Sequence, residues 1–433
     1  MASDAQEQAA LNALRRLRDA GHVAYFAGGC VRDRLLGLQP KDYDIATDAP
    51  PTRVRECFGR TQAVGQAFGV VLVHDFGLPI EVATFRTDGD YGDGRRPDSV
   101  AFADAEHDAQ RRDFTINGLF YDPLDDRIID YVEGRRDLAT RVLRAIGAPE
   151  KRFAEDHLRM LRAVRFAARF GFVIEPQTAA AIVRDAPLLA RISGERVADE
   201  LRRMLAPPTR NAAYEHLWRL GLAPVVFRGA GPSLMGAEAF YETAFSIVHA
   251  MAGGPVPPAF ALLCAAVDYR WQAGGRRREL LGNFADDELS KIVRGLRDSL
   301  KLSNDESDLM TDVGRWTHKL LTTPEPPVAL SLRFLARPNA PSQICLLSAL
   351  EKVGVAVERI RSLRIALDGL SGQDPAPPPL LTGDALVAAG HRPGPAFKKV
   401  LDDVYDAQLE GRVTTEAQAL AFARGLMLGR RAR

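Results

Sequence analysis

The spacing of hydrophobic residues divides the chain into a short mixed segment and a long helical one. Leu11, Leu14 and Leu17 recur at helical spacing before Gly21, which predicts a first helix over residues 7–20 closed by a glycine. Short apolar, β-branched runs follow and predict strands at 23–27, around 45, and at 70–74, 80–85 and 128–132. After about Leu138 segments rich in Ala, Leu and Arg predict helices.

The length of the chain requires several domains. Cores stop growing at roughly 250 to 300 residues, and this chain has 433. Turn-forming proline clusters suggest boundaries near 206–208, 253–258, 323–327 and 373–379. We therefore expect an α+β fold in which a small N-terminal sheet domain precedes an all-α remainder. The expected divisions are 1–138, 139–208, 209–326 and 327–433.

Composition excludes a uniformly basic nucleic-acid binder. The chain has 57 Lys and Arg against 56 Asp and Glu, a formal charge of +1, so any contact with nucleic acid must be local. Arginines do gather at one place, which allows a basic stripe on a neutral protein. They are Arg159, Arg162, Arg165 and Arg169.

Cysteine spacing and hydropathy indicate a cytoplasmic protein. The four cysteines, Cys30, Cys57, Cys264 and Cys345, form no C-x-x-C pair, which argues against a zinc knuckle or a disulfide framework. No apolar run reaches the ~18 residues of a membrane span, and Met1 to Gln8 is acidic rather than signal-like.

A glycine pair after the first predicted strand suggests a phosphate site. Gly28 and Gly29 allow the backbone to approach a phosphate chain closely at the start of a helix. Arg32 lies one turn inside that helix, where its guanidinium can reach a triphosphate, and Gly37 ends the helix.

Two aspartates just beyond this helix suggest a metal site. Residues two apart in a strand point to the same face, so Asp42 and Asp44 can meet at one site. Nucleotidyl transfer uses two Mg²⁺ ions held by shared carboxylates, and Glu81 in an apolar strand is the candidate third acid. A D-x-D pair alone is more often a surface turn; the ordered set with the glycines and Glu81 favours the metal site.

This ordered set resembles the DNA-polymerase-β-like nucleotidyltransferase superfamily, and within it the class II tRNA nucleotidyltransferase and bacterial poly(A) polymerase group. The run R-R-D-F-T-I-N at 111–117 is similar to that family's second motif. The resemblance implies that this motif holds ribose and phosphate, through Arg112, Asp113 and Asn117. The stretch 86–100 resembles the family's flexible loop, which helps to switch nucleotide specificity.

The segment 153–165 is expected to be one helix with Glu155, Asp156 and Arg159 on a single face and Arg162 adjoining. An aspartate accepts a hydrogen bond from the amino group of cytosine or adenine, and an arginine donates to the neighbouring ring atoms. Uracil or guanine would leave an acceptor facing an acceptor, at a cost of roughly 1 to 3 kcal/mol. The alternative is a solvent-exposed helix with an ordinary Asp–Arg ion pair.

The E-D-x-x-R pattern resembles the family's nucleotide-selecting motif. The resemblance implies that Asp156 and Arg159 choose the base and that Arg162 and Arg165 lie nearer the triphosphate. The run Ser193 to Arg196 starts another helix that resembles a further motif, and its expected task is structural.

The C-terminal segment resembles the family's tRNA-binding tail. A helix starts at 381–384, and a Gly- and Pro-rich turn at 390–395 precedes a second helix with Lys398 and Lys399. Backbone N–H groups at that helix start suit a phosphate contact. An ordinary helical hairpin with solvated lysines is the alternative.

The resemblance implies template-independent, Mg²⁺-dependent addition of C, C and A to the 3′ end of tRNA from CTP and ATP, by a catalytic head, a neck, a body and a tail. A poly(A) polymerase is less favoured, because residues 64–70 read V-G-Q-A-F-G-V where that subgroup has a G-R-R-F-like run. A CC-only enzyme and a catalytically silent RNA-binding protein stay open. Neither a membrane nor an obligate protein partner is expected.

Overall fold

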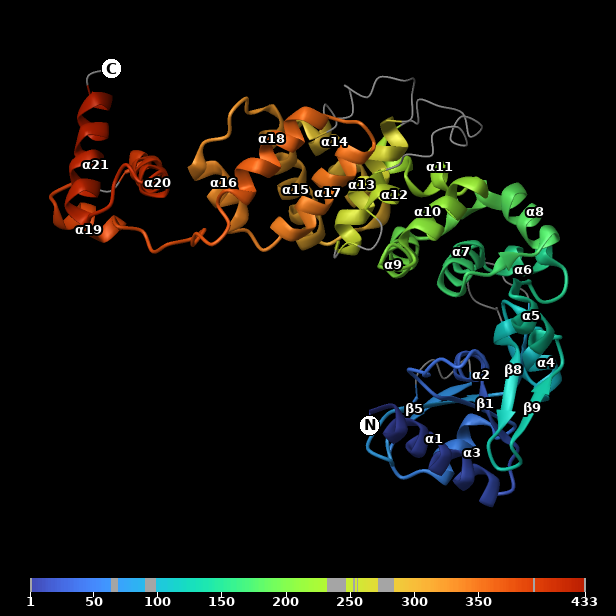
Figure 1. Ribbon diagram of the computed structural model, residues 1–433. Helices are drawn as coiled ribbons and strands as arrows, with labels where there is room; N and C mark the ends of the chain where they lie inside the picture. The colour runs from blue at the N-terminus through green and yellow to red at the C-terminus, as the bar shows by residue number, and fades with distance from the viewer. Residues whose placement is uncertain are drawn as a thin grey trace. The chain divides into compact units, whose positions relative to one another are not determined.

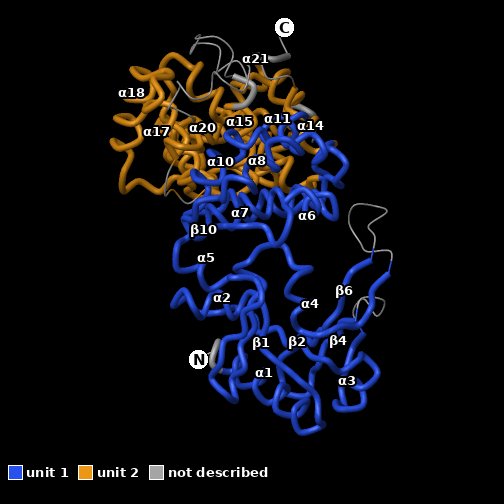
Figure 2. The backbone as a smooth tube through the Cα atoms, turned by 90° about the vertical axis from the view of Figure 1, so that its right-hand side faces the viewer, with its two compact units in different colours: residues 1–228, 299–301 blue, residues 229–298, 302–433 orange. Residues whose placement is uncertain are grey.

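The computed structural model describes residues 2–63, 69–89, 99–231, 247–251, 254, 256–271, 284–391 and 394–431. The chain forms two compact units, shown in blue and orange in Figure 2. Unit 1 comprises residues 1–228 and 299–301, and unit 2 comprises residues 229–298 and 302–433. The expected α+β class is confirmed, since a mixed sheet precedes a long series of helices. The finer division into head, neck, body and tail stays a prediction.

A seven-stranded mixed sheet organises the start of unit 1, in the order β3-β4-β5-β2-β1-β8-β9. Helices α1 and α3 pack against each other and against strands of this sheet (Figure 1). The strands are β1 (Ala24–Ala27), β2 (Asp44–Thr47), β3 (Thr61–Ala63), β4 (Val70–Val73), β5 (Ile80–Thr84), β8 (Leu119–Asp122) and β9 (Arg127–Asp130). Two small ribbons add β6 (Arg86–Asp88) with β7 (Val100–Phe102) and β10 (Val142–Leu143) with β11 (Val173–Ile174).

The centre of the sheet brings the glycine pair, the aspartates and Glu81 together. Strand β1 runs antiparallel to β2 and sets Ala27 opposite Asp44. Strand β2 runs parallel to β5 with Ile45 opposite Val82, so one step earlier in that register Asp44 neighbours Glu81. Strand β8, which the sequence did not predict, is buried along its whole length and therefore lacks the alternation that marks a half-exposed strand.

The remaining elements of unit 1 are mostly helices. They are α1 (Ala2–Asp19), α2 (Gly29–Leu35), α3 (Pro51–Cys57), α4 (Ala105–Gln110), α5 (Gly134–Thr140), α6 (Pro149–Glu155), α7 (Arg159–Phe170), α8 (Pro176–Asp185), α9 (Gly194–Met204), α10 (Arg210–Arg219) and α11 (Ala223–Val226), with 3₁₀ turns η2 (Thr115–Asn117) and η3 (Ala186–Arg191). A third such turn, η4 (Arg228–Ala230), lies where unit 1 gives way to unit 2.

The prediction of one continuous helix over 153–165 is wrong. Helix α6 ends at Glu155 and α7 begins at Arg159, because Asp156 has extended backbone angles (φ −150°, ψ 104°). The Asp156 carboxylate accepts a hydrogen bond from the backbone N–H of Leu158 at 3.0 Å, a local bond that competes with helix continuation. Asp156 therefore sits at a corner between two helices.

Unit 2 is helical throughout its described part. Its helices are α12 (Ile247–Ala250), α13 (Pro258–Trp271), α14 (Asp286–Leu300, whose last two residues count to unit 1), α15 (Asn304–Thr322), α16 (Val328–Leu335), α17 (Ala340–Lys352), α18 (Val357–Asp368), α19 (Gly383–Ala388), α20 (Pro395–Leu409) and α21 (Glu416–Arg431). None of the described helices is long and apolar enough to cross a membrane.

The predicted helix starts in the C-terminal segment are confirmed. Thr382 caps α19 by accepting a hydrogen bond from the N–H of Ala385 at 3.3 Å, and Gly394 precedes α20. Residues such as Leu386 and Val400 form a buried core between α19, α20 and α21. Arg392 and Pro393 of the predicted turn lie outside the described residues.

Candidate nucleotide-binding site

A cleft of about 520 Å³ in unit 1 gathers most of the predicted site residues. Its volume falls in the usual range of ligand pockets, roughly 300 to 1,000 Å³. Eight arginines and three aspartates line it, so its net charge favours an anionic ligand. The lining residues are Gly28, Gly29, Arg32, Asp44, Arg111, Arg112, Asp113, Asn117, Asp156, Leu158, Arg159, Arg162, Arg165, Phe166, Arg169 and Arg196.

Three carboxylates cluster at the sheet end of this cleft. Asp44 is the first residue of β2, and Glu81 lies in β5. Asp42 precedes β2 in a loop, whereas the sequence predicts both aspartates within one strand. Of the three only Asp44 lines the cleft. Among the described residues, no three His, Cys, Asp or Glu side chains already have the geometry to hold a metal ion.

Electrostatics nevertheless fit a cation at these carboxylates. Crowding by the surrounding protein, followed by the nearby charge of Glu81, raises the pKa of Asp44 to about 6, although its side chain keeps contact with solvent. The pKa of Glu81 is also raised, by desolvation and then by Asp42. Neighbouring carboxylates that resist ionising together are stabilised as anions by a divalent cation between them.

Gly28 holds the backbone in a conformation that favours glycine, with φ at 69°. Its N–H donates to the carbonyl oxygen of Leu119 at 3.0 Å, and a Cβ at this position would lie 2.8 Å from an Arg112 nitrogen. Arg112 in turn donates to Asp108 and to the carbonyl of Asn117. Glycine at 28 thus leaves room for Arg112 at the start of α2.

A buried polar chain connects α2 to α7. Arg32, only 4% exposed, donates to Asn117 Oδ1 at 2.6 Å and to Asp33 Oδ1 at 2.6 Å. Asn117 Nδ2 donates to Asp113 at 2.9 Å, and Asp113 accepts from Arg162 Nε at 2.8 Å. Arg32 therefore has protein partners in this state.

Asp113 stays ionised despite its burial. Desolvation opposes the charge, but the attraction of Arg162 together with the hydrogen bonds from Asn117 and Arg162 prevails and lowers the pKa of Asp113 to about 2. The Asp113–Arg162 ion pair consequently joins the second predicted motif to helix α7.

The two predicted base-reading residues do not pair with each other. Asp156 accepts from both terminal nitrogens of Arg196, at 3.2 and 2.7 Å. Arg159 donates through NH1 to Glu155 and, at 3.0 Å, to the carbonyl of Arg152. The simple Asp–Arg surface pair that the sequence allowed is therefore not what the structure contains.

Several cleft residues were absent from the predicted site. Arg196, expected to be structural, holds Asp156, and Arg169 donates to Asp33 at 2.9 Å. The spacing of Arg162, Arg165 and Arg169 on α7 is a signal that could have added Arg169, since residues three and four apart share a helix face. No local signal joins Arg196 to a partner 40 positions away.

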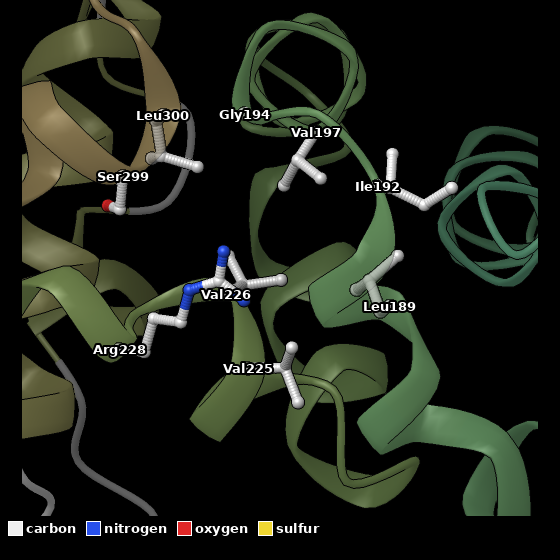
Figure 3. A pocket seen from close by; sticks show the side chains of 9 residues that line it. All are labelled: Leu189, Ile192, Gly194, Val197, Val225, Val226, Arg228, Ser299 and Leu300. Carbon is white, nitrogen blue, oxygen red and sulfur yellow. The ribbon is translucent and has the colours of Figure 1, made fainter.

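A second cavity lies elsewhere in unit 1 and is too small for a nucleotide. Figure 3 shows it between apolar side chains such as Leu189, Val197 and Val226. Its volume is about 10 Å³, room for roughly one water molecule. Gly194 approaches its wall closely, because a Cβ there would lie 2.2 Å from the Ser299 carbonyl oxygen.

Two family descriptions match the chain. Residues 24–144 match "Poly A polymerase head domain", a segment that contains Gly28, Asp44, Glu81 and Arg112. Residues 171–234 match "Probable RNA and SrmB- binding site of polymerase A".

Relatives cover almost the whole chain. A CCA-adding enzyme of Geobacillus stearothermophilus is 35% identical over 422 residues, which cover 95% of both chains. A CCA-adding enzyme of Bacillus subtilis is 46% identical over 197 residues, covering 45% of this chain and 49% of that relative. The solved structure of the Bacillus stearothermophilus CCA-adding enzyme in complex with CTP has a TM-score of 0.69 at 30% identity and covers 98% of both chains.

A more distant structure shares the fold alone. The Thermotoga maritima CCA-adding enzyme, complexed with tRNA, has a TM-score of 0.64 at 20% identity and covers 97% of this chain and 95% of its own. Taken with the arginine-lined cleft and the neighbouring carboxylates, the 35% identity over nearly the full length shows that this chain belongs to the family of CCA-adding enzymes.

Proposed function

We propose that this protein is a CCA tRNA nucleotidyltransferase that acts in the cytoplasm. It adds C, C and A to the 3′ end of tRNA from CTP and ATP, without a nucleic-acid template, and releases pyrophosphate. The observation that carries the proposal is one cleft lined by Asp44, by the base-reading candidates Asp156 and Arg159, and by further arginines. Similarity to a CCA-adding enzyme in complex with CTP supports it.

Membership of the family implies a divalent metal ion, which we take to be Mg²⁺. Oxygen ligands from Asp42 and Asp44 suit this ion, and Glu81, a neighbour of Asp44 in the register of β2 and β5, would complete the site. Held by these carboxylates, such ions would supply activation of the attacking 3′-hydroxyl and charge neutralisation for the departing pyrophosphate. The side chains of Asp42, Asp44 and Glu81 contribute fixed negative charge at the end of the sheet.

The triphosphate lies, in this account, against the start of α2 and the arginines of the cleft. Backbone N–H groups after Gly28 and Gly29 are available to an anion at a helix start, and Arg112, Arg162 and Arg165 would supply guanidinium donors. Arg32 reaches the same region from within α2. Asp113 and Asn117 position Arg162 and Arg32 and hold the ribose side of the site.

Base choice rests on two side chains that their neighbours hold in place. Asp156 accepts three hydrogen bonds, from Leu158 and Arg196, and a carboxylate has about four acceptor positions. One position therefore suits the amino group of cytosine or adenine. Arg159 is held through NH1, and a guanidinium has five N–H donors in all, so others can reach the base.

The substrate tRNA is assigned to the C-terminal helices. Helix α20 begins at Pro395 with Lys398 and Lys399 on its first turns, which suits contacts to phosphates of the RNA backbone. The specificity loop at 86–100 is described only at its two ends, so its conformation does not enter the proposal.

Product length tests the proposal. The purified protein is incubated with Mg²⁺, CTP, ATP and a tRNA transcript that lacks its last three nucleotides, and products are separated at single-nucleotide resolution. We expect extension by C, C and A and then a stop. Long A tails would identify a poly(A) polymerase, a stop after two C residues a CC-only enzyme, and no extension a silent binding protein.

A further inference from the structure

Three arginines of the cleft lie over the ring of one phenylalanine. The guanidinium carbon of Arg165 is 4.2 Å from the centroid of Phe166, that of Arg32 5.2 Å and that of Arg162 5.3 Å. Arg32 comes from α2, whereas the other two belong to α7 with Phe166 itself. The ring of Phe166 therefore contacts arginine side chains from two different helices.

Two neighbouring aromatic rings hold the ring of Phe166 in place. It is only 5% exposed and meets the fully buried ring of Phe114 edge-on, with centroids 5.9 Å apart and planes at 80°. It also stacks on Phe170 at 6.2 Å and 8°. Aromatic pairs in these geometries contribute stabilisation in addition to that of the buried area, which favours a fixed orientation of the rings.

The same arginines are paired with carboxylates that compete with a bound phosphate for their N–H donors. Arg32 donates to Asp33, Arg162 to Asp113, and Arg165 to Glu200 at 2.6 Å. When a triphosphate binds, these guanidinium groups divide their N–H donors between carboxylate and phosphate oxygens or exchange one set of partners for the other. An arginine side chain that is not held in another way must lose rotamer freedom when it binds phosphate, and this loss opposes binding.

An aromatic ring solves this difficulty because it does not compete for the N–H donors. Guanidinium groups stack on aromatic faces through cation–π attraction while their edges stay available for planar hydrogen bonding. Phe166 thus gives the three guanidinium groups a contact that does not compete for their N–H donors, and Arg32 also lies 4.7 Å from the ring centroid of Phe170.

We propose that Phe166 is a positioning residue for triphosphate binding: it orients Arg32, Arg162 and Arg165 while they exchange protein carboxylates for phosphate oxygens. The proposal rests on the proposed function only in taking the cleft as the nucleotide site. It assigns no contact between Phe166 and the base.

Binding of inorganic triphosphate, measured by calorimetry in EDTA, tests the arginines without the metal site and without tRNA. Phe166→Leu removes the ring but keeps an apolar side chain, and Phe166→Tyr restores the ring. Phe172→Leu is the matched control, because Phe172 is 4% exposed and packs on Phe170, while no arginine of the described residues lies over its ring. Thermal unfolding of each variant verifies that it is folded.

We expect Phe166→Leu to weaken triphosphate binding about tenfold, equivalent to about 1.4 kcal/mol, with Phe166→Tyr and Phe172→Leu close to the parent. In extension assays the same variant should raise KM for CTP and ATP alike and leave the preference for CTP over UTP unchanged. Unaltered binding in Phe166→Leu, or an equal loss in Phe172→Leu, would overturn the proposal. Absence of extension by the parent protein would defeat the proposed function and leave the calorimetric test valid.

Discussion

Arg196 donates two hydrogen bonds to the carboxylate of Asp156, from NH2 to Oδ2 at 2.7 Å and from NH1 to Oδ1 at 3.2 Å. The pair connects the start of α9 to the corner between α6 and α7. It orients the aspartate that is proposed to read the base, and together with the Leu158 N–H it supplies hydrogen bonds and opposite charge to the carboxylate.

Replacing Arg196 by Lys should lower kcat/KM for CTP and for ATP by about tenfold, because an ammonium cannot reproduce a bidentate guanidinium bond. Arg202→Lys is the matched control on the same helix, where Arg202 pairs with the exposed Asp199. Steady-state kinetics on tRNA lacking its 3′ end measures both. Equal effects of the two substitutions would show that the Asp156 pairing has no special role.

Asp42→Ala or Asp44→Ala should each reduce nucleotide incorporation more than about a hundredfold, since residues that merely support metal ligands already cost roughly 10- to 100-fold. Binding of tRNA, followed by filter retention, should survive. Asp125→Ala, an exposed residue in the turn between β8 and β9, is the control. Incorporation that persisted in both variants would rule out the assigned metal site.

Gly28→Ala should destabilise the protein more than Gly37→Ala. Both glycines have positive φ, 69° and 68°, and share the backbone cost of roughly 1 to 2 kcal/mol for an L-residue in that region. Only at position 28 does the new Cβ meet a neighbour, an Arg112 nitrogen at 2.8 Å, whereas position 37 has open space. Urea unfolding measures the difference, and KM for CTP should rise in Gly28→Ala alone.

Asp113→Asn should cost about 2 kcal/mol of stability at pH 7, because the folded pKa of about 2 lies well below the ordinary value of 3.8. A carboxylate whose pKa is lower in the folded than in the unfolded protein stabilises the fold at pH values above the unfolded pKa. This contribution disappears as the pH falls through the folded pKa. The difference between parent and variant should therefore shrink between about pH 4 and pH 2. Denaturant unfolding of parent and variant at several pH values measures this difference. A difference in unfolding free energy that stayed the same at every pH would contradict the ion pair with Arg162.

The sequence predicts the parts of this site better than their arrangement. Gly28, Asp44 and Glu81 follow from local patterns, but their proximity depends on the pairing of β2 with β1 and β5, a register that no local pattern specifies. In the sequence Phe166 is an ordinary apolar position of a helix, and only the folded structure shows that Arg32 of another helix lies over its ring.

Local hydrogen bonding explains why the predicted helix over residues 153–165 is interrupted. Residues 153–165 have helical composition, yet Asp156 bonds to the backbone two residues on and breaks the helix. Aspartate offers such alternatives to the backbone more readily than most residues. The partners of Asp156 and Arg159 likewise differ from those that helical spacing suggests.

The central claim is that side chains, Asp156 foremost, replace a template. The ratio of kcat/KM for CTP to that for UTP, measured on tRNA lacking its 3′ end, tests it most directly in the parent and in Asp156→Asn, with Asp199→Asn as control. An asparagine amide can donate to the uracil carbonyl, so the ratio should fall by about tenfold or more. An unchanged ratio in Asp156→Asn would contradict the account.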